Sequence, residues 1–271
     1  MTNKILKIAL VGRTNAGKST LINRIVGEKI SIQNKKINTT QVTIMGVKNI
    51  KKTQLIFYDT PGSNFLKSLN KQSKNLKTNL WSGIDESDII FYLIDSKTAN
   101  IKFLFEQIEK LQEVKKKIIV IFNKIDLISN KQLLPLISNL NKNFQIDSFF
   151  TISAIQNIGI DDLLDYVKKY SYVSKWIFED DEITNKDDIF IVGELLRETM
   201  LTYLHKEIPY NVSIQTSNFK ILKSTDVKIK QKIIINQKRY KKIILGRKGE
   251  MIKKIREDSQ KKMSQILNLL S

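Results

Sequence analysis

An eight-residue match to the pattern G-x-x-x-x-G-K-[ST] constrains the fold of this chain more than any other feature. Its residues are Gly12, Arg13, Thr14, Asn15, Ala16, Gly17, Lys18 and Ser19. The match lies between an apolar run typical of a strand and a segment with helical spacing, a context that a chance glycine-rich turn lacks. Backbone N–H groups there can face phosphate oxygens, Lys18 can reach the β- and γ-phosphates, and the Ser19 hydroxyl can ligate Mg²⁺. The octapeptide, with Thr20 after it, therefore predicts a nucleoside-triphosphate site.

Short apolar runs alternate with helical patterns through the first 170 residues. The runs with strand character are Ile5–Val11, Gln54–Asp59, Ile89–Asp95, Lys117–Asn123 and Phe149–Ser153. Helical spacing is found at Ser19–Val26, Ile101–Leu111, Lys131–Leu140 and Ile160–Tyr170. This alternation predicts an α/β fold with a doubly wound, mostly parallel sheet. The polar stretch Ser63–Thr78 has no strong period, and we expect a mobile segment there.

A second candidate phosphate contact follows the strand that ends at Asp59. The tetrapeptide Asp59, Thr60, Pro61 and Gly62 stands where a carboxylate can hold Mg²⁺ through water and a glycine N–H can sense the γ-phosphate. Asp-x-x-Gly by itself is common turn chemistry. Its place at the end of a strongly apolar strand favours a role at the nucleotide.

The choice of base is indicated by two further strand ends. Asn123, Lys124 and Asp126 follow one apolar strand, and Ser153 and Ala154 follow the next. A carboxylate at Asp126 can accept hydrogen bonds from the N1–H and the exocyclic amine of guanine, whereas adenine offers no such pair of donors. The Lys124 stem can cover the purine face while Asn123 braces neighbouring loops. These residues predict guanine specificity.

Composition changes after residue 170. Residues 171–189 contain the acidic cluster Glu179–Glu182 and predict a linker between two domains, 1–170 and 190–271. Beyond the linker we expect a helix, two alternating strands, a short helix and a long helix. Their ranges are Phe190–Lys206, Tyr210–Asn218, Val227–Asn236, Tyr240–Leu245 and Glu250 toward Leu270.

The two C-terminal helices are separated by a G-x-x-G break, and this loop is typical of a KH domain, where it clamps nucleotide phosphates. Helix, strand, strand and short helix is the order of a type II KH domain, and residues 220–262 hold 16 basic and 4 acidic residues. We therefore predict a smaller α+β type II KH domain with an apolar floor at Ile243, Ile244 and Leu245, about half of it core. The candidate RNA-binding residues are Ile243, Ile244, Gly246, Arg247, Lys248, Gly249 and Lys253.

The net charge of +19 favours polyanionic partners, nucleic acid first and anionic membrane second. The excess is concentrated in residues 190–271, which hold 18 Lys and Arg against 7 Asp and Glu. Cysteine is absent, which excludes disulfides and thiolate zinc sites. No run approaches the ~20 apolar residues of a membrane-spanning helix, and no signal peptide is apparent, so we expect a cytoplasmic protein.

The order GRTNAGKS, Thr39-Thr40, DTPG, NKID and SA, together with the KH-like region, resembles the Era family of bacterial ribosome-assembly GTPases over essentially the whole chain. The resemblance implies GTP and GDP as ligands, with Mg²⁺ held by Ser19, Asp59 and Thr40, the last on the switch-like tract Glu28–Gln41. It also implies binding near the 3′ end of small-subunit ribosomal RNA, on a pre-ribosomal particle, by a monomer. Relatives associate loosely with membranes, so the inner face of the cell membrane is a second expected location.

Hydrolysis of GTP needs positioning and charge neutralisation, for which the candidate catalytic residues are Lys18, Thr40 and Gly62. The position after Gly62 is Ser63 and not a water-orienting Gln, so we expect slow unstimulated turnover, about 10⁻⁴ to 10⁻² s⁻¹. Asn15 leaves two interpretations open, because relatives with Asn there can use K⁺ beside the phosphates, and an Asn can equally brace the loop.

The KH domain of the family continues past its long helix with a third strand and a further helix, whereas this chain stops at Ser271. We therefore expect a shortened domain with a two-stranded sheet and one open edge. Two alternative functions stay open: an RNA-binding protein that keeps GTP only as a structural ligand, and a GTPase that works at a membrane surface.

Overall fold

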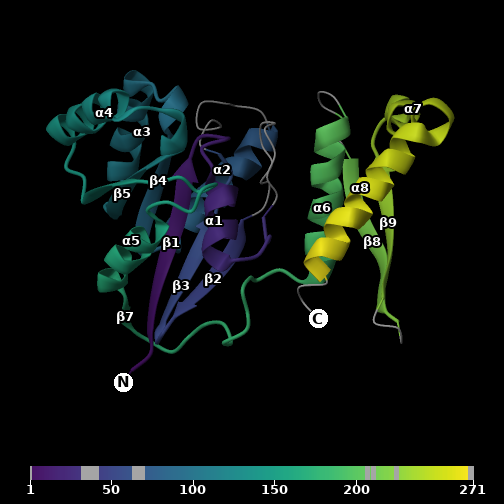
Figure 1. Cartoon of the computed structure of the whole chain (residues 1–271), viewed down its shortest axis with the longest axis horizontal. Coiled ribbons are helices and arrows are strands. Elements are labelled where there is room, and N and C mark those ends of the chain that lie inside the picture. The colour runs from purple at the N-terminus through teal and green to yellow at the C-terminus, as the bar shows by residue number, and fades with distance from the viewer. Residues whose placement is uncertain are drawn as a thin grey trace. The chain divides into compact units, whose positions relative to one another are not determined.

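The computed structural model describes residues 2–31, 43–62, 71–204, 208, 212–222 and 226–267. The chain divides into two compact units, the first ending at Asn185 and the second beginning at Lys186 (Figure 1). Each unit has a hydrophobic core of its own. No helix among the described residues is long and apolar enough to cross a bilayer.

The first unit is built on the mostly parallel sheet that the sequence predicts. Its main strands run in the order β2 (Ile44–Ile50), β3 (Thr53–Asp59), β1 (Lys4–Gly12), β4 (Ile89–Asp95), β5 (Lys117–Asn123) and β6 (Ser148–Thr151). All are parallel except β2, which pairs antiparallel with β3. Parallel strands place their carboxyl ends at one edge, so the loops after β1, β3, β5 and β6 are brought together there.

Helices α1 (Lys18–Val26), α2 (Lys71–Asp85), α3 (Ile101–Gln112), α4 (Asn130–Asn143) and α5 (Ile160–Val167) accompany the sheet, with short 3₁₀ turns at Ser96–Thr98, Ile125–Leu127 and Lys168–Tyr170. Apolar side chains of α2, α3 and α4 pack on β1, β4 and β5 in one cluster, which includes Ala9 and Val11. The alternate residues of β1 point to the opposite face. There α1 packs against β1, β2 and β3.

Two elements of the first unit differ from the sequence prediction. Strand β2 was not expected, because Gly46, Lys48 and Asn49 interrupt its apolar alternation. It forms through antiparallel pairing with β3. Helix α2 includes residues 71–78 of the segment expected to be mobile, and residues 63–70 of that segment lie outside the described part. Leu80 and Ile84 of α2 are buried in the core, whereas the sequence of the first half of the helix is mostly polar, which concealed the helical period.

The predicted linker 171–189 is wrong in its extent, because residues 172–185, here called the strap, belong to the first unit. Strand β7 (Tyr172–Val173) pairs antiparallel with Lys4 and Ile5 of β1. Farther along the strap, the backbone N–H of Val47 donates to the carbonyl of Ile183 at 2.8 Å. Backbone hydrogen bonds of this kind do not depend on an apolar pattern, so the polar composition of the strap concealed them.

Gln54 is the buried anchor of the strap. Its side-chain oxygen accepts the N–H groups of Ile177 at 2.9 Å and Phe178 at 3.1 Å, and its amide nitrogen donates to the Phe178 carbonyl at 2.9 Å. The indole N–H of Trp176 donates to the carbonyl of Lys4 at 3.1 Å. The strap is therefore fixed to β3 and β1 by side chains as well as by backbone.

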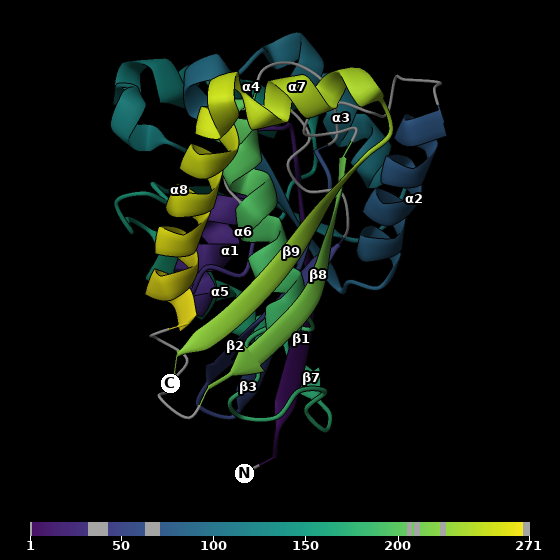
Figure 2. The same cartoon turned by 90° about the vertical axis from the view of Figure 1, so that its right-hand side faces the viewer.

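The second unit has the α+β form that the sequence predicts. It contains α6 (Asp188–Tyr203), β8 (Val212–Ile221), β9 (Val227–Ile235), α7 (Lys238–Leu245), a 3₁₀ turn (Arg247–Gly249) and α8 (Glu250–Leu267). Within the described residues its sheet consists of the antiparallel pair β8 and β9. The three helices and the inner face of this hairpin share one core (Figure 2).

Candidate functional site

The loop between β1 and α1 has the backbone that its glycines allow. Gly12 and Gly17 have φ angles of 158° and 98°. A Cβ on Gly12 would collide with the carbonyl oxygen of Leu93, and one on Gly17 would collide with the Asn123 side chain. Within this loop the Arg13 guanidinium lies 4.6 Å from the centre of the Phe103 ring, and Ala16 is buried. Both glycines are therefore required by close packing as well as by phosphate geometry.

Lys18 lies in the fold of this loop and is almost completely buried. Its ammonium group donates to the carbonyls of Gly12 at 2.9 Å and Arg13 at 3.0 Å. Burial lowers the pKa of Lys18 to about 8, and the negative charge of Asp59 opposes part of that shift. A phosphate group placed in the loop would favour the charged form of Lys18.

The carboxylate of Asp59 gathers two hydroxyl groups at the end of β3. Ser19 donates to its Oδ2 at 2.8 Å, and Ser31 donates to the same oxygen at 2.7 Å. Asp59 is fully buried beside Lys18. Mg²⁺ prefers oxygen ligands of this kind, so Ser19 and Asp59 fit the metal that the sequence predicts, and nucleotide phosphates would complete the site.

Ser31 was not predicted as a site residue, and Asn23 of α1 holds it in place. The Asn23 side-chain oxygen accepts the N–H groups of Ile30 at 3.0 Å and Ser31 at 2.9 Å, while its amide donates to the Ser31 carbonyl at 2.7 Å. Ser31 directly precedes residues 32–42, which lie outside the described part and contain Thr39 and Thr40. The predicted roles of Thr40, as a metal ligand and as a catalytic residue, therefore stay predictions.

The tetrapeptide after β3 is fixed to β1 and to the phosphate loop. The Thr60 hydroxyl donates to the Leu10 carbonyl at 2.6 Å, so it serves to anchor the strand end. Pro61 is buried. A Cβ on Gly62 would lie 2.7 Å from the backbone nitrogen of Thr14, so only glycine allows these two loops to approach so closely.

Asn123 joins three loops through one buried side chain. Its amide nitrogen donates to the carbonyl of Ala16 at 2.9 Å, and its side-chain oxygen accepts the N–H groups of Lys124 at 2.8 Å and Ala154 at 3.0 Å. The bracing role expected of this residue is therefore present in the structure. The phosphate loop and both base-recognition segments form one connected surface.

Lys124 and Asp126 are each held by a side chain of another strand end. The Lys124 ammonium donates to the Asn15 carbonyl and to the Asp95 carboxylate, both at 2.6 Å. The Ser153 hydroxyl donates to Asp126 at 2.6 Å. This hydrogen bond holds one oxygen of the Asp126 carboxylate, and Asp126 is otherwise exposed.

Sequence reasoning missed Arg24 and Asp95. Arg24 of α1 donates to the carbonyls of Ala154 at 3.2 Å and Ile155 at 2.9 Å, so it supports the loop after β6. Asp95, which pairs with Lys124, ends the apolar strand β4 at the same sheet edge as the other loops. An acidic residue in that place was a usable signal, whereas nothing in the sequence marks Arg24.

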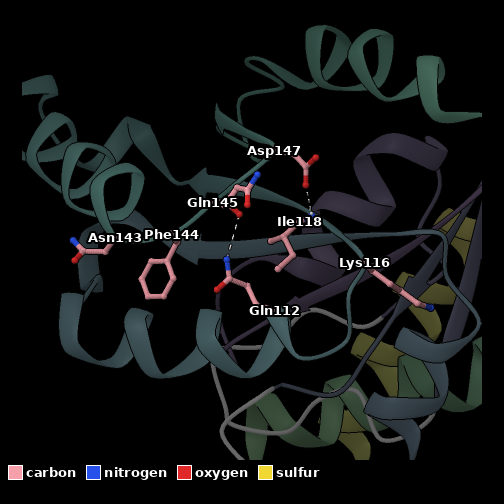
Figure 3. Close-up of a pocket in the computed structure, with 7 residues that line it drawn as sticks. All are labelled: Gln112, Lys116, Ile118, Asn143, Phe144, Gln145 and Asp147. Carbon is pink, nitrogen blue, oxygen red and sulfur yellow. Dashed lines mark hydrogen bonds between the residues drawn. The ribbon is translucent and has the colours of Figure 1, made fainter.

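A separate pocket of about 450 Å³ lies near the amino ends of β5 and β6, away from these loops (Figure 3). Its polar groups are already engaged with the protein. Asp147 accepts the N–H of Ile118 at 3.1 Å, the Gln112 amide donates to the Gln145 carbonyl at 3.2 Å, and Lys116 donates to carbonyls at the end of α2. We assign no ligand to it.

The G-x-x-G break of the second unit is a tight turn between α7 and α8. Gly246 and Gly249 have φ angles of 71° and 84°, and Lys248 between them has a φ of 49°. A Cβ on Gly246 would lie 2.6 Å from Cβ of Met251. Arg247 and Lys248 are exposed, so their charged groups are available to an anionic partner.

The apolar floor predicted beside this turn needs a correction. Ile244 is only 5% exposed and belongs to the core of the second unit, so its side chain is not available to RNA. Ile243 and Leu245 are 49% and 40% exposed, as the helical period requires of its neighbours. Lys253 is exposed on α8, with its ammonium 3.9 Å from Glu257.

Two family models match the chain. One is described as "50S ribosome-binding GTPase" and matches residues 7–124, and the other is described as "KH domain" and matches residues 203–269. The matches fall on the first and second units respectively.

Relatives and solved structures match over nearly the whole chain. The protein called GTPase Era of Rickettsia prowazekii is 37% identical over 268 residues, which are 98% of this chain and 90% of the relative. GTPase Era of Agrobacterium fabrum is 36% identical over 96% of this chain and 81% of the relative. The crystal structure of Era in complex with MgGDPNP and nucleotides 1506–1542 of 16S ribosomal RNA matches with a TM-score of 0.88 and 29% identity. It covers 98% of this chain and 90% of that one, as does an Aquifex aeolicus Era variant bound to GDP·AlF₄⁻.

Proposed function

The chain belongs to the Era family of GTPases and hydrolyses GTP. From this we propose that the protein is a molecular switch controlled by GTP hydrolysis. It binds small-subunit ribosomal RNA near its 3′ end and assists assembly of the small subunit. The observation that carries the proposal is that one chain joins the connected nucleotide loops to an exposed, basic G-x-x-G turn. The Era structure with 16S ribosomal RNA nucleotides supports the choice of RNA.

In the first unit, hydrolysis depends on positioning and on neutralising phosphate charge. Lys18 binds the β- and γ-phosphates, Ser19 and Asp59 hold Mg²⁺, and the Gly62 N–H contacts the γ-phosphate. Bound Mg²⁺ supplies charge neutralisation on the phosphate oxygens. Thr40 would add a metal ligand as in the family, and Ser63 in place of a water-orienting Gln keeps unstimulated turnover slow.

In the second unit, the turn Gly246–Gly249 clamps RNA phosphates while Arg247 and Lys248 add charge-assisted contacts. The exposed Ile243 offers an apolar surface for an unstacked base, and Lys253 extends the basic surface onto α8. Because Ile244 is buried, Ile243 and Leu245 are the members of the predicted apolar floor that remain exposed.

Crosslinking the protein to RNA in cells and sequencing the bound RNA tests the proposal directly. We expect reads concentrated at the 3′ end of small-subunit ribosomal RNA, and their loss in R247Q/K248Q. An exposed pair on α4, K131Q/K142Q, is the matched control for charge. Reads spread over unrelated transcripts would contradict the proposal.

The switch itself is tested by comparing RNA affinity with GDP and with a non-hydrolysable GTP analogue. Identical affinities, with hydrolysis absent in a single-turnover assay, would favour the alternative in which GTP is only a structural ligand. The rate of GTP hydrolysis in KCl, compared with the rate in NaCl, decides between the two interpretations of Asn15. The backbone carbonyl of Asn15 already accepts a hydrogen bond from the Lys124 ammonium group. Faster hydrolysis in KCl supports a K⁺ ion beside the phosphates.

A further inference from the structure

The β8–β9 hairpin presents four lysines on one side. The burial of both strands alternates residue by residue, so that Lys228, Lys230 and Lys232 of β9 and Lys220 of β8 are exposed. We call these four residues the lysine face. The residues between them, including Ile229 and Ile233, pack into the core of the second unit. The lysine face is therefore the side of the hairpin turned away from α6, α7 and α8, and Figure 2 shows that side uncovered by these helices.

The register places the lysines in a continuous array. Lys220 lies directly opposite Lys228, Asn218 opposite Lys230, and Gln215 opposite Lys232. Alternate residues of a strand are about 6.6 Å apart, so the three lysines of β9 form an evenly spaced row. A bulge between Thr216 and Asn218 adds the exposed Ser217 to this side, where its hydroxyl donates to the Lys230 carbonyl at 3.1 Å.

Within the described part of the chain, no carboxylate is paired with any lysine of this face. Neither strand contains an Asp or a Glu. Like charges directly opposite each other in an antiparallel pair are destabilising, so Lys220 and Lys228 raise the free energy of the free hairpin. A bound polyanion would remove that repulsion.

We propose that the lysine face binds the phosphate backbone of RNA, as a second contact in addition to the Gly246–Gly249 turn; this rests on the proposed RNA binding of the second unit. Lys, Ser, Asn and Gln side chains are the groups that contact phosphate without reading sequence, and this side of the hairpin carries all four types. The lysine face extends the footprint on RNA and makes binding more dependent on salt without adding base specificity.

The surrounding residues favour RNA over an anionic membrane. Membrane-surface segments pair basic residues with large apolar side chains that enter the lipid. On this side of the hairpin the exposed apolar residue is Ile234, at the end away from Lys220 and Lys228, and the positions from Gln215 to Lys220 and from Lys228 to Lys232 that share the side are polar or charged.

The test compares two RNAs in the intact protein. One is a tetranucleotide, the length that a G-x-x-G turn clamps, and the other is an unstructured RNA several times longer. For K228Q/K230Q we expect about tenfold weaker binding of the long RNA at 0.15 M salt, with a salt slope reduced by about 1.4, since two phosphate contacts are lost. Binding of the tetranucleotide should not change. K131Q/K142Q on α4 is the control for net charge.

Three results for K228Q/K230Q would overturn the proposal. The first is a loss of affinity for the long RNA no larger than that of K131Q/K142Q, and the second is an equal loss of affinity for both RNAs. The third is unchanged RNA affinity with lost binding to anionic phospholipid vesicles. Thermal unfolding checks that K228Q/K230Q folds, and we expect it to be at least as stable because the repulsion with Lys220 is relieved. R247Q/K248Q separates this proposal from the proposed function. If R247Q/K248Q binds both RNAs with normal affinity, the proposed RNA binding by the Gly246–Gly249 turn is contradicted. The proposal for the lysine face is tested only by the affinities of K228Q/K230Q.

Discussion

At the residue scale, the proposed preference for guanine is tested most directly at Asp126. Replacing it by Asn turns an acceptor into a donor that opposes the 2-amino group of guanine, while xanthine offers a carbonyl oxygen there. We expect D126N to bind GDP at least ~100-fold more weakly and to gain affinity for xanthosine diphosphate. Titration with fluorescent nucleotides measures both. Asp161→Asn on the exposed start of α5 is the control, and an unchanged preference for guanine would contradict the assignment.

Lys18 makes nucleotide binding sensitive to pH. Burial lowers its pKa to about 8, so above pH 8 the free protein holds Lys18 mostly neutral, whereas bound phosphates favour the charged form. Binding at pH 8.5 should therefore take up about three quarters of a proton through Lys18, and binding at pH 7 only about a tenth of one. Calorimetry in two buffers of different ionisation enthalpy measures the uptake. Equal uptake at both pH values would show that Lys18 is already charged in the free protein.

The sequence motifs identified the residues proposed to contact the nucleotide, but they missed most of the side chains that hold those residues in place. Lys18, Asp59, Asn123 and Asp126 each have a chemical role that fixes their place in a motif. Asn23, by contrast, supports Ser31 through contacts that exist only in the folded chain. A positioning side chain of this kind has no local pattern, because its partner is supplied by the fold.

At the scale of elements, the strap depends on Gln54. Its side chain makes three hydrogen bonds to the strap, and their loss in Gln54→Ala should cost about 3 kcal/mol. The strap would then open about 100-fold more often, and trypsin should cleave after Lys175 correspondingly faster. Asn49→Ala removes one exposed contact to the strap, at Asp180, together with a hydrogen bond that Asn49 accepts from Gln54, and leaves the three bonds from Gln54 to the strap in place, so it should have a smaller effect. Equal cleavage rates for both variants would contradict this role of Gln54.

Elements that are apolar throughout were predicted best. The bounds of β4 and β5 match the sequence prediction, because strands buried on both faces read as continuous apolar runs. Strand β7 has two exposed residues and is defined only by its pairing with β1. In α7 the spacing indicated that part of Ile243–Leu245 is core, but the structure was needed to show that Ile244 is the buried one.

The whole molecule consists of two units that have separate cores, and this predicts two unfolding events. A ligand stabilises only the unit that binds it, by RT ln(1 + [L]/Kd). In calorimetric scans GDP with Mg²⁺ should raise the Tm of one transition by several degrees, and the other should not move. RNA should act on the other transition. A single transition that rises with either ligand would contradict independent cores.

The two-unit architecture followed from the order of the motifs, since a phosphate loop and a G-x-x-G turn each belong to a particular arrangement of strands and helices. The boundary between the units did not follow. Residues 172–185 are polar enough to resemble a linker, and only their hydrogen bonds to β1, β2 and β3 assign them to the first unit. Composition identifies segments that do not build a core, but it does not show where such segments attach.

The amide of Asn123 joins the loop between β1 and α1 to the segments after β5 and β6, so a displacement of any one of the three is passed to the other two. In the proposed GTPase these segments meet opposite ends of the nucleotide. Loss of this one side chain would therefore weaken the contacts to the phosphates and to the base at the same time.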